Sequence, residues 1–276
     1  MNLLTRNFHC LMLFTLLSSS SIAQTVSPTS VTIDGNTLQA KLQVTTLIEV
    51  DLVVEFEKSV GLIADNINIS ATLSDVNSIN ITNRISSSSI KAIPTFPVII
   101  SISPKADTGF AFEGLASVEI YTQSVDYNAA MPARIFRSHT NGDFEDITSM
   151  ISAGSIRARG NTGSFSDFMI LLDERSNADM IDDTFSQLNV LLNQHSNNIS
   201  SILAITLQTS INALQQALLM SDYDTSLDVV EELIFIIENA SGEQLSNVWR
   251  SSNDLVNMQG ELLTRLRTLK YTLRII

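Results

Sequence analysis

Cysteine is almost absent from this chain. Its single cysteine, Cys10, lies in an apolar N-terminal leader, so a mature protein without the leader has no cysteine. We therefore expect no disulfide, no thiol nucleophile and no thiolate metal ligand. Stability has to come from packing, and 276 residues are enough for two modest domains that each bury a core.

Histidine and basic residues are also scarce. Beyond the leader only His139 and His195 are available as neutral bases, and they fall in different expected domains. This argues against Ser–His catalysis, and without HExxH or HxH spacing it gives no specific zinc site. The net charge of −13 argues against nucleic acid as a partner. No phosphate-binding glycine loop or dinucleotide motif is present, so we expect no cofactor.

Aromatic residues make up 6% of the chain and include one tryptophan. Sugar-active clefts usually need an aromatic stacking platform, so this shortage disfavours a glycosidase. Paired carboxylates could still come from four acidic residues near one end of the expected β domain, namely Asp143, Glu145, Asp146 and Asp167. An accessory or degenerate hydrolase acting on cell-envelope carbohydrate is therefore the alternative function.

The N-terminus has the pattern of a secretory signal peptide. Arg6 precedes an apolar run over residues 11–17, and Ser21 and Ala23 are small residues at the positions that signal peptidase reads. We expect residues 1–23 to be removed and the mature chain to begin at Gln24. No other apolar stretch of about twenty residues stands out, so we expect a secreted or periplasmic protein without membrane insertion after signal removal.

Residues 24–175 have the pattern of an antiparallel β-sandwich. Short strands with alternating polar and apolar residues follow at even spacing, and Asp34-Gly35 is a strong hairpin signal. Over residues 155–159 the arginines should share one face while Ile156 and Ala158 face the core. Residues 160–163 are expected to form a hairpin turn, followed by a central strand over residues 168–172.

Residues 176–276 change to a helical period and predict a helical bundle domain. Four amphipathic helices are expected, with apolar stripes over residues 181–192, 199–218, 227–237 and 245–273. Asp222 or Asp224 should cap the third helix, a capping box at Ser241 and Gln244 should start the fourth, and Trp249 should anchor the bundle core. The fold class is therefore α+β and multidomain, an antiparallel β-sandwich followed by an all-α helical bundle.

Two groups of basic residues are candidate binding sites. In the fourth helix Arg265, Arg267, Lys270 and Arg274 either complement the helix dipole or form a basic patch, and the dipole explanation is simpler. In the β domain four arginines on neighbouring strands could contact an anionic ligand: Arg134, Arg137, Arg157 and Arg159. We favour instead their pairing across strands with the acidic residues at 143, 145, 146 and 167.

Several segments resemble an uncharacterised family of secreted bacterial β-sandwich proteins: residues 118–122, 134–137, 142–148, 154–160 and 165–168. The helical part resembles the FIMAH-type module that ends many exported bacterial hydrolases and binding proteins, through residues 214–218, 222–224, 227–237 and Gly242. These likenesses imply a shared fold without an activity to carry over. We therefore expect a non-catalytic extracytoplasmic binding, adhesion or assembly module, whose partner is an envelope protein or a glycan.

Overall fold

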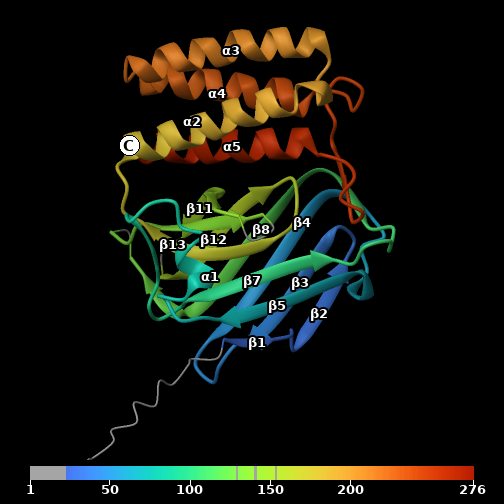
Figure 1. The fold of residues 1–276 in the computed structure, drawn as a ribbon, viewed down its shortest axis with the longest axis vertical. Coiled ribbons are helices and arrows are strands. Elements are labelled where there is room, and N and C mark those ends of the chain that lie inside the picture. The colour runs from blue at the N-terminus through green and yellow to red at the C-terminus, as the bar shows by residue number, and fades with distance from the viewer. Residues whose placement is uncertain (1–22, 129, 140–141, 153) are drawn as a thin grey trace, which may run out of the picture.

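The structure is a computed structural model that describes residues 23–128, 130–139, 142–152 and 154–276. The expected signal peptide, residues 1–23, lies outside the described residues except for its last position. The described chain forms fourteen strands and five α-helices, arranged as two sheets with a layer of helices over one of them (Figure 1).

Both sheets are antiparallel and contain seven strands each. Sheet A has the order β1-β5-β7-β13-β9-β10, with β6 also paired to β13. Its strands are β1 (Gln24–Val26), β5 (Ile67–Leu73), β6 (Ile90–Ala92), β7 (Val98–Pro104), β9 (Ala133–Ser138), β10 (Phe144–Asp146) and β13 (Asp167–Asp173). The apolar segment 168–172 lies in β13, which pairs with β6 and β7 on one side and β9 on the other, so the prediction of a central strand is confirmed.

Sheet B has the order β11-β12-β8-β4-β3-β2, with β14 also paired to β8. Its strands are β2 (Ser30–Asp34), β3 (Thr37–Gln43), β4 (Glu49–Val60), β8 (Ala111–Tyr127), β11 (Thr148–Ser152), β12 (Gly154–Thr162) and β14 (Val248–Arg250). Alternation along β12 agrees with the prediction, because Ile156 and Ala158 are buried while Arg157 and Arg159 are half-exposed. The expected hairpin turn at residues 160–163 is wrong, because β12 continues to Thr162 and the next strand belongs to the other sheet.

The sheets pack face to face around one apolar core. Side chains from both contribute to it, among them Leu52 and Val118 of sheet B and Ile100 and Phe168 of sheet A. Consecutive strands also link the sheets at two edges, because β1 is followed by β2 and β10 by β11. The chain at these edges therefore passes from one sheet to the other within a few residues.

The helices are α1 (Ile79–Thr82), α2 (Asn177–Gln194), α3 (Ser201–Leu219), α4 (Tyr223–Glu238) and α5 (Met258–Arg274). Three of them have side-chain N-caps: Ser176 for α2, Asp222 for α4 and Asn257 for α5. The Asp222 carboxylate accepts from the amide of Thr225 at 3.1 Å, which confirms it as a cap. The periodic stripes of the first three expected helices correspond to α2, α3 and α4.

The predicted fold class is wrong, because residues 176–276 do not form an all-α bundle following a β-sandwich. The segment expected to open the fourth helix contains β14, which pairs with β8 in sheet B, and α5 begins only at Met258. α5 then packs against β8, β11 and β12, with α2 and α4 on its other side and α3 outermost (Figure 1). The helices are thus a layer built onto sheet B. The apolar spacing over residues 245–256 suits a strand and its flanking loops as well as it suits a helix.

Trp249 lies in a strand and not in a helix. It is buried as predicted, but it lies in β14 and packs against Phe110, Phe112 and Phe165 of the core between the sheets. It is therefore not an anchor of a helical bundle. Ser241 and Gln244 do interact, since the Ser241 amide donates to the Gln244 side chain at 3.1 Å, but they belong to a turn and cap no helix.

By length and composition, α3 is the one described helix that could cross a membrane, although one face of it packs into the helical layer. This uncharged stretch was not recognised as a possible span from the sequence. The expected domain boundary, between residues 175 and 176, falls between β13 and α2.

Candidate functional site

The four candidate arginines do not form one group. Arg134 and Arg137 of β9 are buried where the sheets meet α5, whereas Arg157 and Arg159 of β12 are on the outer face of sheet B. The structure therefore divides them between a buried charged network and a surface.

Arg137 belongs to the most extensive of the buried networks. Its guanidinium donates to both carboxylate oxygens of Glu261 in α5, at 2.7 and 2.9 Å. Arg265, one helical turn later, donates to Glu261 at 2.7 Å and also to Glu145 of β10. Burial tends to raise the pKa of Glu261, but the positive charges of Arg137 and Arg265 outweigh burial and hold its pKa well below the ordinary range. Glu261 is thus an ionised structural partner between sheet A and α5.

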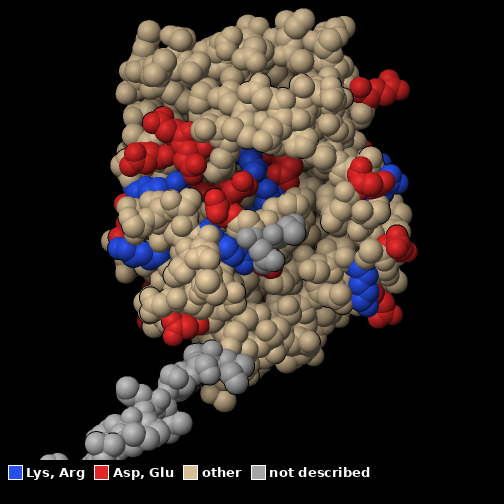
Figure 2. Space-filling view, viewed as in Figure 1, with Lys and Arg blue, Asp and Glu red and all other residues tan. Residues whose placement is uncertain are grey.

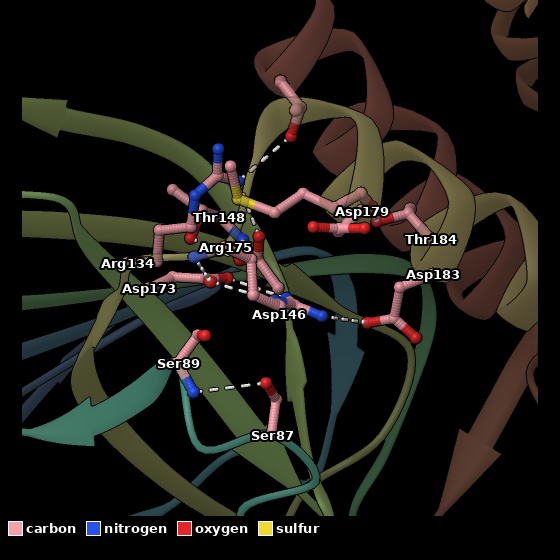
Figure 3. A network of polar contacts seen from close by, with 12 residues as sticks. Ser87, Ser89, Arg134, Asp146, Thr148, Asp173, Arg175, Asp179, Asp183 and Thr184 are labelled. Atoms are coloured by element: carbon pink, nitrogen blue, oxygen red, sulfur yellow. Dashed lines mark hydrogen bonds and ion pairs between the residues drawn. The ribbon is translucent and has the colours of Figure 1, made fainter.

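Arg134 forms a second buried pair. It donates to Asp146 of β10 at 2.6 Å and to the hydroxyl of Thr272 in α5 at 3.0 Å, and Asp146 also accepts from Thr148 (Figure 3). The same view shows Arg175, between β13 and α2, bridging Asp173 and Asp183 at 2.7 Å each. Pairing of Arg134 with Asp146 and of Arg137 with Glu145 confirms the cross-strand interpretation for these two arginines.

Arg157 and Arg159 pair with a carboxylate outside the set expected from the sequence, which was residues 143, 145, 146 and 167. Both donate to Glu119 of β8, which lies between them and is only 5% exposed, with Arg159 at 2.8 and 3.1 Å. Arg157 also lies over the ring of Tyr121, 4.7 Å from its centroid. Glu119 escaped the sequence reasoning because it lies nearly forty residues away along the chain, and only strand pairing brings it adjacent.

A large cleft lies beside these residues, between sheet B and the helices α4 and α5. It has a volume of about 820 Å³, and we call it the seam cleft. Its sheet side is formed by β4, β8, β11 and β12, and its helical side by the last turns of α4 and α5. The lining residues are Glu55, Phe56, Glu57, Leu115, Ser117, Ser149, Met150, Arg159, Asn161, Ile234, Glu238, Arg267, Lys270, Tyr271 and Arg274. A smaller cleft of about 400 Å³ shares Glu57 and Glu238 with it.

Some of the charged side chains that line the seam cleft form ion pairs, and others do not. Arg159 pairs with Glu119, Arg267 with Glu238 at 2.7 Å, and both Lys270 and Arg274 with Glu231 at 2.9 Å. The hydrogen bond from Lys270, together with its charge, lowers the pKa of Glu231. Among the described residues, Glu55 and Glu57 form no ion pair. Two carboxylates of α4, Glu231 and Glu238, therefore pair with three cations of α5, whereas the described carboxylates of the cleft without an ion partner lie on its sheet side.

The residues considered for catalysis lie in separate surroundings. Asp146 pairs with Arg134, Asp167 with Arg84 at 2.9 Å, and Glu145 with Arg137 and Arg265, so three of the four carboxylates considered for glycoside hydrolysis are held by arginines. His139 follows β9, whereas His195 caps the end of α2. The described part of the chain also contains no cluster of three side chains able to hold a metal ion.

Figure 2 shows where the charged side chains gather. On this face many of them lie at the junction between the helical layer and the sheets and others are spread over the sheets below it, while the uppermost part of the molecule is largely uncharged. The charged junction is consistent with the buried pairs described above.

The chain was compared with models of known protein families. The model of a family of unknown function, DUF6689, matches residues 11–276 of the chain. No curated protein and no solved structure matches it.

Proposed function

We propose that this chain, which belongs to the DUF6689 family of unknown function, is an exported non-catalytic binding module whose ligand occupies the seam cleft. The observation that carries the proposal is the cleft itself. It is about 820 Å³ in volume, within the range of ligand-binding clefts, and polar and apolar groups both line it.

Two carboxylates on the sheet side of the cleft, Glu55 and Glu57, favour a ligand with a positive group. A new anion would have to compete with carboxylates that already hold Arg159, Arg267, Lys270 and Arg274. A cation would instead meet Glu55 and Glu57, which are unpaired. This argues against the anionic ligand considered for the arginines and in favour of a lysine- or arginine-bearing segment of an envelope protein.

The apolar lining supports a polypeptide over a simple sugar. Leu115, Met150, Ile234 and Tyr271 give the cleft apolar surface on both its sheet and its helical side. A peptide can bury an aliphatic side chain there while its charged end reaches the carboxylates. The hydrolase alternative gains no support from this geometry, since three of its four carboxylates are held by arginines.

A cleft-filling variant tests the proposal. Ser149→Trp should occupy the cleft and abolish binding of basic peptides from an immobilised library of extracytoplasmic sequences, whereas Thr32→Trp, on a distant strand of the same sheet, should not. Glu55→Gln with Glu57→Gln should weaken the same peptides several-fold and reduce the salt dependence of binding. Equal binding by Ser149→Trp and the wild type would exclude the seam cleft as the site.

Export is part of the proposal, supported by the order of charged, apolar and small residues in the leader. The mass of the protein recovered outside the cytoplasm should correspond to a chain beginning at Gln24. A mass that includes Cys10 would refute cleavage at this point.

A further inference from the structure

We propose that α3 is a self-association surface, through which two copies of this chain pair as antiparallel helices about a twofold axis. This proposal is independent of the seam cleft. It begins from the position of α3, which is the outermost helix and packs into the helical layer through one face only (Figure 1). Leu203, Leu207, Ile211 and Leu214 form that buried face.

The opposite face of α3 is apolar at both ends. Ile202, Ile205, Leu219 and the following Met220 are each at least 70% exposed. Large apolar side chains that cluster in the open usually mark an interaction surface. These four lie on the outer face because α3 turns its other side toward α4.

The outer face also has the spacing of a coiled-coil seam. Its exposed residues recur at alternating intervals of three and four: Ile202, Ile205, Thr209, Asn212, Gln216 and Leu219. This is the a/d spacing of a coiled-coil seam, with apolar residues at both ends and Thr209, Asn212 and Gln216 in the middle. The flanking positions Thr206, Gln208, Ala213 and Gln215 are exposed and uncharged, so nothing beside the seam repels a second helix.

One antiparallel register brings the apolar ends of this seam together. If two copies of α3 pair antiparallel with their axis between Thr209 and Asn212, Ile202 of one copy meets Leu219 of the other, and Ile205 meets Gln216. Thr209 and Asn212 then face each other at the centre, where an amide can hydrogen-bond across and fix the register. A twofold contact requires such matching of a surface with itself.

The absence of charged residues on α3 is the reason that we expect a second copy of this chain to bind there. The chain carries a net charge of −13, but the 19 residues of α3 include no charged side chain. Two copies can therefore approach through this face with little of the repulsion that the rest of their surfaces would cause. At 1.5 Å per residue α3 offers a contact about 28 Å long. A contact through one helix buries less area than most stable interfaces, so the dimer is expected to be weak and concentration-dependent.

Sedimentation equilibrium over several decades of protein concentration tests the proposal. The wild type should shift reversibly from monomer to dimer, and Ile205→Glu should remain a monomer because it places a charge on the seam of each copy. Phe235→Glu is the matched control, since Phe235 is 67% exposed on α4 and outside the seam, and it should dimerise like the wild type. A wild type that stays monomeric, or an Ile205→Glu variant that still dimerises, would overturn the proposal.

A charge-swap pair tests the antiparallel register and does not depend on the folding of one variant. Ile202→Glu and Leu219→Lys should each dimerise poorly alone and should form a heterodimer when mixed, since Glu then meets Lys at one end and Ile meets Leu at the other. Flotation with phosphatidylcholine vesicles tests a lipid surface as the rival occupant. A monomer in solution that floats with vesicles, and loses flotation through Ile205→Glu, would replace the dimer with a membrane contact.

Discussion

Glu261 is the residue on which the attachment of α5 to the sheets most depends. It accepts hydrogen bonds from Arg137, Arg265 and Ser164, and both arginines are nearly inaccessible to solvent. Removing one partner of such a group leaves the other charge buried and unpaired, which costs far more than the pair contributes when intact.

Glu261→Gln should therefore lower the free energy of unfolding by about 3–5 kcal/mol, as breaking a buried ion pair typically does. Denaturant unfolding followed by circular dichroism measures this. Asp254→Asn is the matched control, because the pair of Asp254 with Arg250 is half-exposed and screened by solvent, so its loss should change stability little. Equal effects of the two variants would contradict the structural role of the Glu261 network.

The same carboxylate predicts a direction of pH dependence. In the unfolded chain Glu261 has an ordinary pKa of 4.5, whereas in the folded protein its pKa lies well below this value. As the pH falls below the ordinary pKa, Glu261 binds a proton in the unfolded state but stays ionised in the folded state. Acid should therefore destabilise the fold. Stability measured from pH 6 downward should decline less steeply in Glu261→Gln than in the wild type.

Trp249 gives a second prediction at this scale. It is 5% exposed and lies among three phenylalanines between the sheets, so its native fluorescence should be blue-shifted and poorly quenched. Trp249→Ala should destabilise the protein by about 3–5 kcal/mol through lost burial and the cavity left behind. The loss should appear in the β-sheet signal as well as the helical signal. Melting of the helices alone would contradict its place in the sheet core.

Among the elements, α5 is the one that joins the layers. Its N-cap Asn257 donates to the carbonyl of Gly114 in β8 at 2.6 Å, and Gly260 lies directly against Gly114 and Gly163. A Cβ on Gly260 would lie 2.7 Å from the Gly114 carbonyl oxygen, which is closer than side chains approach backbone atoms. Because Gly260 has no side chain, the first turn of α5 contacts the backbone of Gly114 and Gly163 directly.

The stability of Gly260→Ala shows whether steric packing or helix propensity has the larger effect at this position. Alanine favours a helix over glycine by about 1 kcal/mol, whereas forcing an atom into a packed contact costs about 1–3 kcal/mol. We expect a net loss of stability, because two of the three nearest atoms belong to the backbone of Gly114 and Gly163 and cannot rotate away. An increase in the thermal midpoint of Gly260→Ala would show that α5 does not approach β8 this closely.

At the scale of the whole molecule, the contacts across residues 175 and 176 argue that the chain unfolds as one unit. Residues 24–175 alone would lose β14 from sheet B, leave the core beside Phe112 open and leave Arg134 without Thr272 and Arg137 without Glu261. The change in hydrophobic period alone predicts two separable segments, whereas these contacts lead us to predict that the segments do not fold separately.

The intact chain should therefore show a single unfolding transition, with the fluorescence of Trp249 and the helical circular dichroism changing together. A fragment of residues 24–175 should show no cooperative melting. Cooperative melting of this fragment would restore the original division into two domains.

The sequence by itself determined the features that depend on local pattern. Alternation placed Ile156 and Ala158 inside and Arg157 and Arg159 outside, the apolar run at residues 168–172 indicated a central strand, and Asp222 was recognised as a helix cap. The unknown-function family was also anticipated from turn and core segments. Each of these features follows from residues within a few positions of one another.

Only the tertiary structure decided the partners of those residues. It paired Arg157 and Arg159 with Glu119, inserted Trp249 into sheet B and engaged Arg137 with Glu261, a residue 124 positions away. Local periodicity carries no information on such contacts, because a short apolar segment suits a strand and a helix alike until a neighbouring element provides its hydrogen bonds. The fold class failed for this reason: the segment before α5 became a strand because β8 had an edge free to pair with it.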